Sequence, residues 1–417
     1  MTTEPTGNAD QAIIGPVTVG VVAHGGHCVA RVSDPDAGPG GRVVFVRHAL
    51  PGEQVLIRIT DTSHKRFWRG DAVEILVASA DRREAPCPIF HPGGCGGCDF
   101  QHATEAAQRE LKRTVVAEQL QRLAGIEWTG DVEEASPVWG WRTRMRYQVT
   151  GRESDGAQRL GMRVHRSHAV IGLPDQGCAI AAVDPRKLEP VADHWSGNAA
   201  TGRHAGDASV AGANPADAEL LVVTSADGVS IGSPRDRAEV TERAAGRDFA
   251  VDFAGFWQVH PAAADTLVAA VLDGLQPQAG ERAFDLYCGV GLFAGALADR
   301  GVQVWGLESG RGAVAHARRN VPEGRFSVGR VEKGLRDLPG QTDLVVLDPP
   351  RAGAGKTVME QISRREPRAI AYVACDPAAL ARDLAHAGEL GWQVRSLRAF
   401  DLFPQTHHIE CVAVLER

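Results

Sequence analysis

The residue most clearly placed to do chemistry is Cys375, which follows an apolar run at 369–373 and precedes Asp376 and Pro377. The apolar run predicts a buried strand, and a proline is typical of the first turn of a helix. The thiol would then lie between a strand and a helix, where open α/β sheets bind their ligands. A helix N-terminus also favours the thiolate, the nucleophilic form of cysteine. We interpret Cys375 as a candidate nucleophile, with a plain core cysteine as the alternative.

A second group of thiols has the spacing of metal ligands. Cys95 and Cys98 form a C-x-x-C motif, and Cys87 precedes it by seven intervening residues. Such a cluster in a reducing compartment is typical of a metal site. The spacing allows either tetrahedral zinc or an iron–sulfur cluster, because both accept four thiolates. Cys28, Cys288 and Cys411 have no partner in sequence and are expected to be buried apolar thiols.

A glycine-rich turn indicates a cofactor site further along the chain. Gly289 and Gly291 follow a predicted strand at 283–288 and open a predicted helix, while Glu308 ends a second predicted strand at 302–307. Glycines let a ligand approach the backbone closely, and a carboxylate at Glu308 can accept from both ribose hydroxyls. This pattern fits a dinucleotide-binding fold and a methyltransferase fold equally well. A third predicted strand at 344–347 ends in Asp348-Pro349-Pro350-Arg351, whose prolines would fix the Asp348 carboxylate at the sheet edge.

These residues need elements to position them. Short apolar runs at 16–22, 43–46, 55–59 and 71–77 predict a small β-barrel over 13–79. A helix is expected over 103–124, and β character returns from 136 to about 235, with a loose insertion at 196–218. From about 250 onward, strands alternate with helices, which is typical of a parallel α/β sheet. We therefore expect a multidomain α+β chain with domains at 13–79, 80–250 and 251–417.

Composition limits the partners. The chain has 417 residues and a formal charge of −7, so any nucleic acid must meet a local basic patch. One candidate is a predicted strand at 139–147, on which Arg142, Arg144 and Arg146 would share one face. The alternative is a solvated strand face. No apolar run reaches 18 residues and no basic leader is read, so we expect a cytoplasmic protein without a membrane partner.

Five motifs in this order resemble the RNA uridine-5-methyltransferase family. They are Phe256-Trp257-Gln258-Val259, Asp285-Leu286-Tyr287-Cys288-Gly289-Val290-Gly291, Asp348-Pro349-Pro350-Arg351, Cys375-Asp376-Pro377 and Phe403-Pro404-Gln405-Thr406-His407-His408-Ile409-Glu410. The first 79 residues resemble the TRAM domain of that family, an OB-like barrel. The resemblance implies a C-terminal class I, Rossmann-like methyltransferase domain. It also implies transfer of a methyl group from S-adenosylmethionine to carbon 5 of a uridine in tRNA or 23S rRNA.

The resemblance also implies roles for individual residues. Cys375 matches the nucleophile that adds to carbon 6, and Glu410 matches the base that removes the carbon 5 proton. Cofactor contacts are implied for Gln258, Tyr287, Gly289, Gly291, Glu308 and Asp348. Two positions depart from the family pattern: Leu292 stands where asparagine is usual, and the 328–331 segment lacks the usual aspartate.

The same resemblance implies a fourth ligand for the predicted metal site. Cys178 lies in a segment like the one that supplies the fourth ligand in the family, which favours a [4Fe–4S] cluster on Cys87, Cys95, Cys98 and Cys178. Apolar neighbours of Glu410 are expected to raise its pKa.

Alternative functions remain at this point. The glycine-rich turn would suit a nicotinamide-dependent oxidoreductase, but that reading leaves Cys375 and the Asp-Pro-Pro-Arg turn without a role. A non-catalytic RNA-binding relative is the second alternative, because of Leu292 and Arg330. The barrel and the four cysteines favour 23S rRNA over tRNA as substrate, and we expect a monomer.

Overall fold

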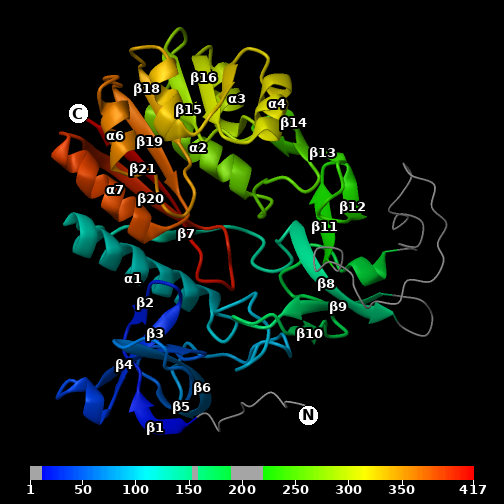
Figure 1. Cartoon of the computed structure of the whole chain (residues 1–417), viewed down its shortest axis with the longest axis vertical. Coiled ribbons are helices and arrows are strands. Elements are labelled where there is room, and N and C mark those ends of the chain that lie inside the picture. The colour runs from blue at the N-terminus through cyan, green and yellow to red at the C-terminus, as the bar shows by residue number, and fades with distance from the viewer. Residues whose placement is uncertain (1–11, 153–157, 189–218) are drawn as a thin grey trace, which may run out of the picture. The chain divides into compact units, whose positions relative to one another are not determined.

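The computed structural model describes residues 12–152, 158–188 and 219–417, shown as coloured ribbon in Figure 1. The chain forms two compact units. Unit 1 comprises Met1–Val115, Arg163–Ile171 and Gln405–His407, and unit 2 comprises Val116–Met162, Gly172–Pro404 and His408–Arg417. The insertion expected at 196–218 lies outside the described residues.

Unit 1 is built on a six-stranded sheet of order β1-β5-β6-β4-β3-β2. The strands are β1 (Ile13–Thr18), β2 (Val22–Ala23), β3 (His27–Val32), β4 (Arg42–Arg47), β5 (Gln54–Asp61) and β6 (Phe67–Val77). Alternate residues such as Val44, Val46, Val55 and Ile57 are fully buried and form one core. The apolar runs predicted at 43–46, 55–59 and 71–77 are confirmed as parts of β4, β5 and β6.

Unit 2 contains an eight-stranded sheet of order β17-β16-β15-β18-β19-β21-β20-β7. Its strands are β7 (Val132–Glu134), β15 (Arg282–Leu286), β16 (Gln303–Glu308), β17 (Arg325–Val328), β18 (Leu344–Leu347), β19 (Ala369–Ala374), β20 (Gln393–Asp401) and β21 (Glu410–Glu416). Strands β15 to β19 run parallel, and β21 runs antiparallel to β19. The predicted parallel α/β arrangement is thereby confirmed.

Helices cover both faces of this sheet, because successive residues of its strands point to opposite sides and both sides are apolar. One core joins the sheet to α2 (Ala263–Leu275), α3 (Leu292–Ala298) and α4 (Arg311–Asn320). The other joins it to α5 (Val331–Gly334), α6 (Lys356–Ser363), α7 (Pro377–Glu389) and the second half of α1 (Glu105–Ala124). Figure 1 shows α3 and α4 on one side of the yellow-to-red strands and α6 and α7 on the other.

The remaining strands of unit 2 lie between residues 144 and 252. Strands β9, β8, β11 and β12 are neighbours in that order, and β13 pairs with β14. Their bounds are β8 (Arg144–Arg152), β9 (Gln158–Arg163), β11 (Glu219–Ser225), β12 (Gly228–Gly232), β13 (Glu239–Ala244) and β14 (Arg247–Asp252), while β10 (Val170–Gly172) falls at a boundary of the two units along the chain. Among the described residues, no helix combines the length and apolarity needed to cross a membrane.

The prediction that Arg142, Arg144 and Arg146 form an exposed basic face on one strand is wrong. Strand β8 begins at Arg144, and the Arg144 side chain is buried against Glu242, with 2.8 Å between Nη2 and Oε1. Its Nη1 also donates to the carbonyl oxygens of Phe253 and Gly255. Arg146 is exposed, at 57% of its side-chain surface. Alternation along β8 does put Arg144 and Arg146 on one face, but the Arg144 guanidinium is buried there, where it meets a carboxylate and two carbonyl oxygens.

Candidate active site

The candidate residues of unit 2 collect at one edge of its sheet. Tyr287 follows β15, Glu308 ends β16, Asp348 follows β18 and Cys375 follows β19. Leu286 is level with Leu307 and with Leu347 in the parallel ladder, so these strands end together. Carboxyl ends of parallel strands are where open α/β sheets bind ligands. The arrangement therefore brings the predicted nucleophile to the same edge as the predicted cofactor residues.

Glu410 reaches this edge from the opposite direction. It is the first residue of β21, which pairs antiparallel with β19 so that Ala374 faces Cys411. The next step along that ladder places Glu410 beside Cys375. The Glu410 side chain is buried, at 4% exposure. Two residues that are 35 positions apart in sequence thus become neighbours through a single strand pairing.

The turn that carries Cys375 is held by local hydrogen bonds. Asp376 caps α7, and its Oδ1 accepts from the backbone N–H of Ala379 at 2.8 Å. Pro377 occupies the first turn, where its missing N–H costs no hydrogen bond. The strand predicted before Cys375 and the helix predicted from Pro377 are confirmed, and they leave the Cys375 thiol half-buried.

The electrostatics of Cys375 differ from the sequence expectation. Burial and the neighbouring carboxylates of Glu410 and Asp348 raise the pKa of the Cys375 thiol to about 11, although the Arg351 guanidinium acts in the opposite direction. A helix N-terminus favours thiolate, but desolvation and two acids outweigh it here. In the free protein the thiol is therefore protonated at neutral pH.

The two acids are shifted in the same sense. Burial raises the pKa of Glu410 well above its usual range, and Asp348 adds to this shift while Arg351 opposes it. Burial also raises the pKa of Asp348 to about 7. The raised pKa expected for Glu410 from its apolar neighbours is confirmed in direction. The site consequently holds several protons when no ligand is bound.

The segment after Asp348 is anchored by a buried hydrogen-bond network. Asp383 on α7 accepts from the Tyr372 hydroxyl at 2.6 Å and from the backbone N–H of Ala354 at 2.7 Å. It also accepts from the N–H of Gly355. Arg351, four residues before Gly355, contacts His408 with Nη2 3.2 Å from Nε2. This network ties the turn that bears Asp348 and Arg351 to the helix behind Cys375.

The glycine-rich turn has the shape of a ligand cradle. Gly289 and Gly291 have φ of 54° and 96°, and a side chain on Gly289 would enter open space. Tyr287 is held at φ 63°, a left-handed conformation that is uncommon for a non-glycine residue. At the next strand, Glu308 Oε1 accepts from the Gly310 N–H at 2.6 Å. The backbone here is shaped to leave room at the strand ends.

Asp285, which the motif contains but which was not assigned a role, is the buried acid of this turn. Its Oδ2 accepts from the Ala294 N–H at 2.9 Å, and its Oδ1 has no partner among the described residues. Burial raises the pKa of Asp285 to about 8. Its position within a buried strand next to a glycine turn is the sequence signal that would have singled it out.

These features fit an adenosyl cofactor. Carboxylates at adjacent strand ends, Glu308 and Asp348, suit the polar groups of such a ligand, and the cradle at Gly289 admits a close backbone approach. Gln258 is buried, at 9% exposure. The two positions that depart from the family pattern lie in different surroundings. Leu292 is a core residue at the start of α3, whereas Arg330 is exposed and lies 3.6 Å from Glu332.

The predicted metal ligands are divided between the two units. Cys87, Cys95 and Cys98 belong to unit 1 and Cys178 to unit 2. Over the described ranges, no three His, Cys, Asp or Glu side chains are grouped so as to hold a metal ion. Cys95 Sγ does accept from the Gly97 N–H at 3.3 Å. The [4Fe–4S] cluster stays a prediction. Cys28, Cys288 and Cys411 are buried as expected.

Two family models match the chain. The model described as "tRNA (Uracil-5-)-methyltransferase" matches residues 333–417, which include Asp348, Cys375 and Glu410. The model described as "TRAM domain" matches residues 15–73, within the six-stranded sheet of unit 1. The matches therefore cover the barrel and the part of the candidate active site that holds Asp348, Cys375 and Glu410.

Similar proteins extend over nearly the whole chain. An RNA methyltransferase of Streptomyces avermitilis is 51% identical, with 96% of this chain and 97% of the relative covered. A Shewanella amazonensis protein named 23S rRNA (uracil(1939)-C(5))-methyltransferase RlmD is 31% identical, with 90% and 91% covered. Among solved structures, the Pyrococcus abyssi tRNA (uracil-54, C5)-methyltransferase in complex with S-adenosyl-L-homocysteine superposes with a TM-score of 0.65 at 22% identity, over 95% of this chain and 99% of that one.

Proposed function

The chain belongs to the S-adenosylmethionine-dependent RNA uracil-5-methyltransferase family, and we propose on that premise that it methylates carbon 5 of a uridine in 23S rRNA through a covalent cysteine adduct. The observation that supports this mechanism best is the pairing of β19 with β21, which puts the Cys375 thiol beside the Glu410 carboxyl. A nucleophile and a base at adjacent positions are what the reaction requires.

The proposed reaction assigns each residue one step. Carbon 5 of uracil is a weak nucleophile, so the Cys375 thiolate first adds to carbon 6 and turns the ring into an enolate. Carbon 5 would then take the methyl group of S-adenosylmethionine, whose sulfur keeps the electron pair of the broken bond and leaves as S-adenosylhomocysteine. Carbon 5 would still carry its proton. The Glu410 carboxylate removes that proton, and the electrons left behind expel Cys375 from carbon 6. The thiolate and the methylated base are both released.

The proposed reaction requires both Cys375 and Glu410 to lose a proton. Cys375 and Glu410 both hold protons in the free protein, because burial raises the pKa of each. Each must lose its proton before it can act as nucleophile or base. Arg351 favours the ionised form of both groups, so we assign it the task of stabilising them during the reaction.

The cofactor would be held at the adjacent strand ends. We assign contacts to the adenosyl and methionine portions to Gln258, Tyr287, Glu308 and Asp348, with Gly289 and Gly291 shaping the backbone that approaches them. When bound, S-adenosylmethionine supplies an electrophilic methyl group and a positive charge that favours ionised acids nearby. Asp285 would orient the glycine turn through its bond to the Ala294 N–H.

The proposal of 23S rRNA rests on similar proteins. Two Shewanella relatives named as 23S rRNA uracil-5-methyltransferases are 31% and 30% identical to this chain over 90% of its length. The tRNA enzyme among the solved structures is 22% identical and supports the fold alone.

The test uses purified protein, S-adenosylmethionine and ribosomal RNA and tRNA transcripts that lack modifications. We expect mass mapping to find one 5-methyluridine in 23S rRNA and none in tRNA. The Cys375→Ala variant is expected to form no product while binding the cofactor normally. Methylation of tRNA alone would contradict the substrate, and full activity of Cys375→Ala would contradict the mechanism.

We also propose that the four cysteines bind a [4Fe–4S] cluster. The C-x-x-C motif with a third thiol in twelve residues supports this, as does the N–H···S hydrogen bond to Cys95, a type of contact found around cluster sulfurs. Protein purified without oxygen should be brown and contain about four irons. Cys95→Ser and Cys178→Ser should lose the colour. Stoichiometric zinc and no visible absorbance would contradict this proposal. No step of methyl transfer depends on the cluster.

A further inference from the structure

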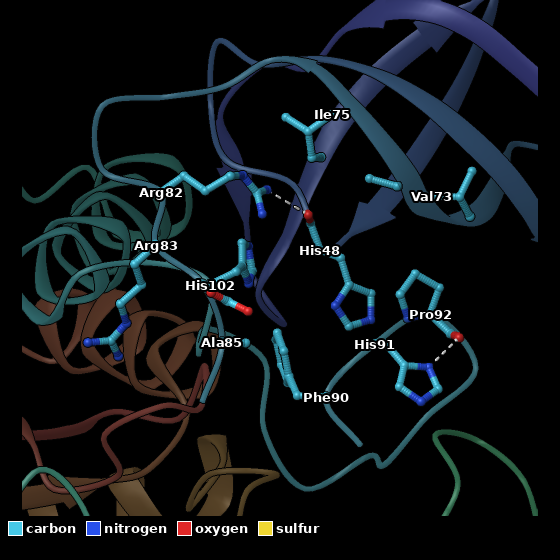
Figure 2. A pocket seen from close by; sticks show the side chains of 12 residues that line it. His48, Val73, Ile75, Arg82, Arg83, Ala85, Phe90, His91, Pro92 and His102 are labelled. Carbon is cyan, nitrogen blue, oxygen red and sulfur yellow. Dashed lines mark hydrogen bonds between the residues drawn. The ribbon is translucent and has the colours of Figure 1, made fainter. Parts of the chain in front are cut away.

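A hollow in unit 1 and a hydrogen-bond network in unit 2 both lie outside the proposed chemistry. The hollow has a volume of about 470 Å³, and His48, Phe90 and His102 lie around it (Figure 2). Among the described residues, His48 Nε2 and His102 Nδ1 lack hydrogen-bond partners, but these atoms are shielded from solvent and do not face the hollow. The hollow therefore gives no sign of a ligand. The network, which is built around Asp383, leads to the proposed nucleophile.

Asp383 is buried, at 6% exposure, and its carboxylate accepts several hydrogen bonds. Its Oδ2 accepts from the Tyr372 hydroxyl at 2.6 Å and from the N–H groups of Ala354 and Gly355 at 2.7 and 3.1 Å. The Tyr372 hydroxyl, itself fully buried, also accepts from the Ala354 N–H at 3.0 Å. Breaking any of these bonds would leave a buried polar group unsatisfied. The network therefore fixes the backbone at Ala354 and Gly355.

The two side chains of this network flank Cys375 in sequence. Tyr372 lies on β19, three residues before Cys375, and Asp383 lies on α7, eight residues after it. Strand β19 is buried along its whole length, and α7 is capped by Asp376, the residue next to Cys375. The network therefore attaches the 351–355 segment to the same strand and helix that carry the thiol.

Arg351 lies in a tight turn that ends at this attachment. The Gly353 N–H donates to the Pro350 carbonyl oxygen at 2.8 Å, so residues 350–353 form a β-turn with Arg351 at its second position. Gly353 has φ 88°, and a Cβ on it would lie 2.7 Å from Asp383 Oδ2. Glycine lets the carboxylate approach the turn this closely. The place of Arg351 thus depends on the rigid proline before it and on Asp383 after it.

The charge of Arg351 matters because of what surrounds the thiol. Several charged groups act on Cys375, namely Arg351 and the carboxylates of Glu410, Asp348 and Asp376. Burial first, and then the carboxylates, raise the pKa of the Cys375 thiol, whereas Arg351 lowers it. Interactions between charges weaken with distance. If Arg351 moved away by a few ångströms, the carboxylates would act on the thiol with less opposition.

We propose that Asp383, supported by Tyr372, is a positioning residue that keeps the Arg351 guanidinium close to the Cys375 thiol. The inference rests on the proposed function, because it takes Cys375 to be the nucleophile. Asp383 acts through the 351–355 segment and not on the reacting atoms. Its loss should leave the thiol in place and lower the fraction of thiolate, because the carboxylates stay while the guanidinium moves.

The test measures alkylation of Cys375 by iodoacetamide as a function of pH, with the Cys375 peptide followed by mass spectrometry. Asp383→Asn keeps the size of the side chain but turns an NH₂ group toward N–H donors. It should slow alkylation at pH 9 by about two- to fivefold and move the pH midpoint of the rate upward. In an Arg351→Ala background the same substitution should change the rate by less than about twofold, since the charge it positions is already absent.

Two further variants separate positioning from loss of stability. Tyr372→Phe removes one hydroxyl and keeps the ring, so it should move the midpoint in the same direction by less, and it serves if Asp383→Asn does not fold. Arg144→Ala should destabilise unit 2 without touching this network, so its midpoint should equal that of the wild type. An unchanged midpoint in every folded network variant would overturn the proposal. So would an equal effect in the Arg351→Ala background, or an equal shift in Arg144→Ala.

Alkylation does not depend on methyl transfer, so the two proposals fail separately. If no RNA is methylated but the midpoint still depends on Asp383, the proposed function is wrong and the positioning role stands. If methylation requires Cys375 but the midpoint does not depend on Asp383 or Tyr372, the function stands and the network is purely structural.

Discussion

The thiol that we propose as the nucleophile, Cys375, is protonated in the free protein. The pKa of Cys375 is raised to about 11 by burial and by the acids Glu410 and Asp348, so at neutral pH only a small fraction is thiolate. Such a nucleophile resists alkylation and oxidation while the site is empty. Activation then depends on binding, since cationic ligands or a closer Arg351 would favour the thiolate.

Replacing the proposed base should trap the reaction. Glu410→Gln keeps the size of the side chain but cannot accept the carbon 5 proton, so the methylated ring should stay attached to Cys375. Denaturing gels of enzyme, S-adenosylmethionine and RNA should show a stable shifted band, with turnover reduced at least about a hundredfold, as is typical for loss of a general base. Cys375→Ala serves as the control without a band. Normal turnover with no band would remove Glu410 from the role of base.

Arg351 should control the ionisation of the thiol. Its charge opposes the raised pKa of Cys375, so Arg351→Ala should raise that pKa further. Because the thiolate is the reactive form, alkylation of Cys375 by iodoacetamide at pH 9 should slow severalfold, and the pH midpoint of the rate should move upward. Arg330→Ala, an exposed arginine of unit 2, is the control. A midpoint at or below pH 9 in the wild type would contradict the raised pKa.

At the scale of strands and turns, the sequence located some elements of the site better than others. The apolar runs at 344–347 and 369–373 located β18 and β19 well, since a strand buried on both faces leaves a continuous apolar run in sequence. The partner of β19, strand β21, had to start at Glu410 for the site to form, and motif resemblance rather than periodicity pointed to it. Asp285 escaped assignment because a buried acid inside an apolar strand has no signature apart from its surroundings.

The two arginines of β8 should behave differently. Arg144→Ala leaves Glu242 buried without its partner and two carbonyls without a donor, which should cost about 3–5 kcal/mol of unfolding free energy. Arg146→Ala removes an exposed side chain and should change stability by less than about 0.5 kcal/mol. Urea unfolding measures both.

RNA binding separates the same pair of variants. If Arg146 meets a phosphate, Arg146→Ala should reduce the slope of log affinity against log salt by about one. Equal stability of the two variants would contradict the burial of Arg144, and an unchanged salt slope would make Arg146 an ordinary solvated residue.

At the scale of the whole molecule, unit 1 is assembled from three separate stretches of chain. The shortest is Gln405–His407, in which the Gln405 carbonyl oxygen accepts from the N–H groups of Asp99 and Phe100. The Gln405 side chain accepts from Gln108 Nε2 at 2.8 Å, and His407 Nδ1 lies 2.6 Å from Asp99. No sequence periodicity could have predicted this, because Gln405 and His407 bond to partners about three hundred positions away.

A fragment that ends at residue 171 should therefore be an incomplete unit 1. It retains the six-stranded sheet but leaves the amides of Asp99 and Phe100 without the Gln405 carbonyl oxygen, and Gln108 Oε1 without the Gln405 N–H. We expect the Phe100 amide to exchange its hydrogen at least about tenfold faster in the fragment than in the full chain, while amides of β4 and β5 stay protected. Equal protection of Phe100 in both would show that the 405–407 segment is dispensable.

The division of unit 1 into separate stretches also means that its parts are synthesised at different times. The ribosome completes the first two stretches of unit 1 more than two hundred residues before it reaches Gln405. At typical elongation rates that interval lasts roughly ten to fifty seconds. Throughout it, the nascent chain carries a barrel whose last hydrogen-bond partners have not been made. Residues 405–407 thus complete unit 1 late, and a chain truncated before residue 405 would be incomplete in unit 1 as well as in unit 2.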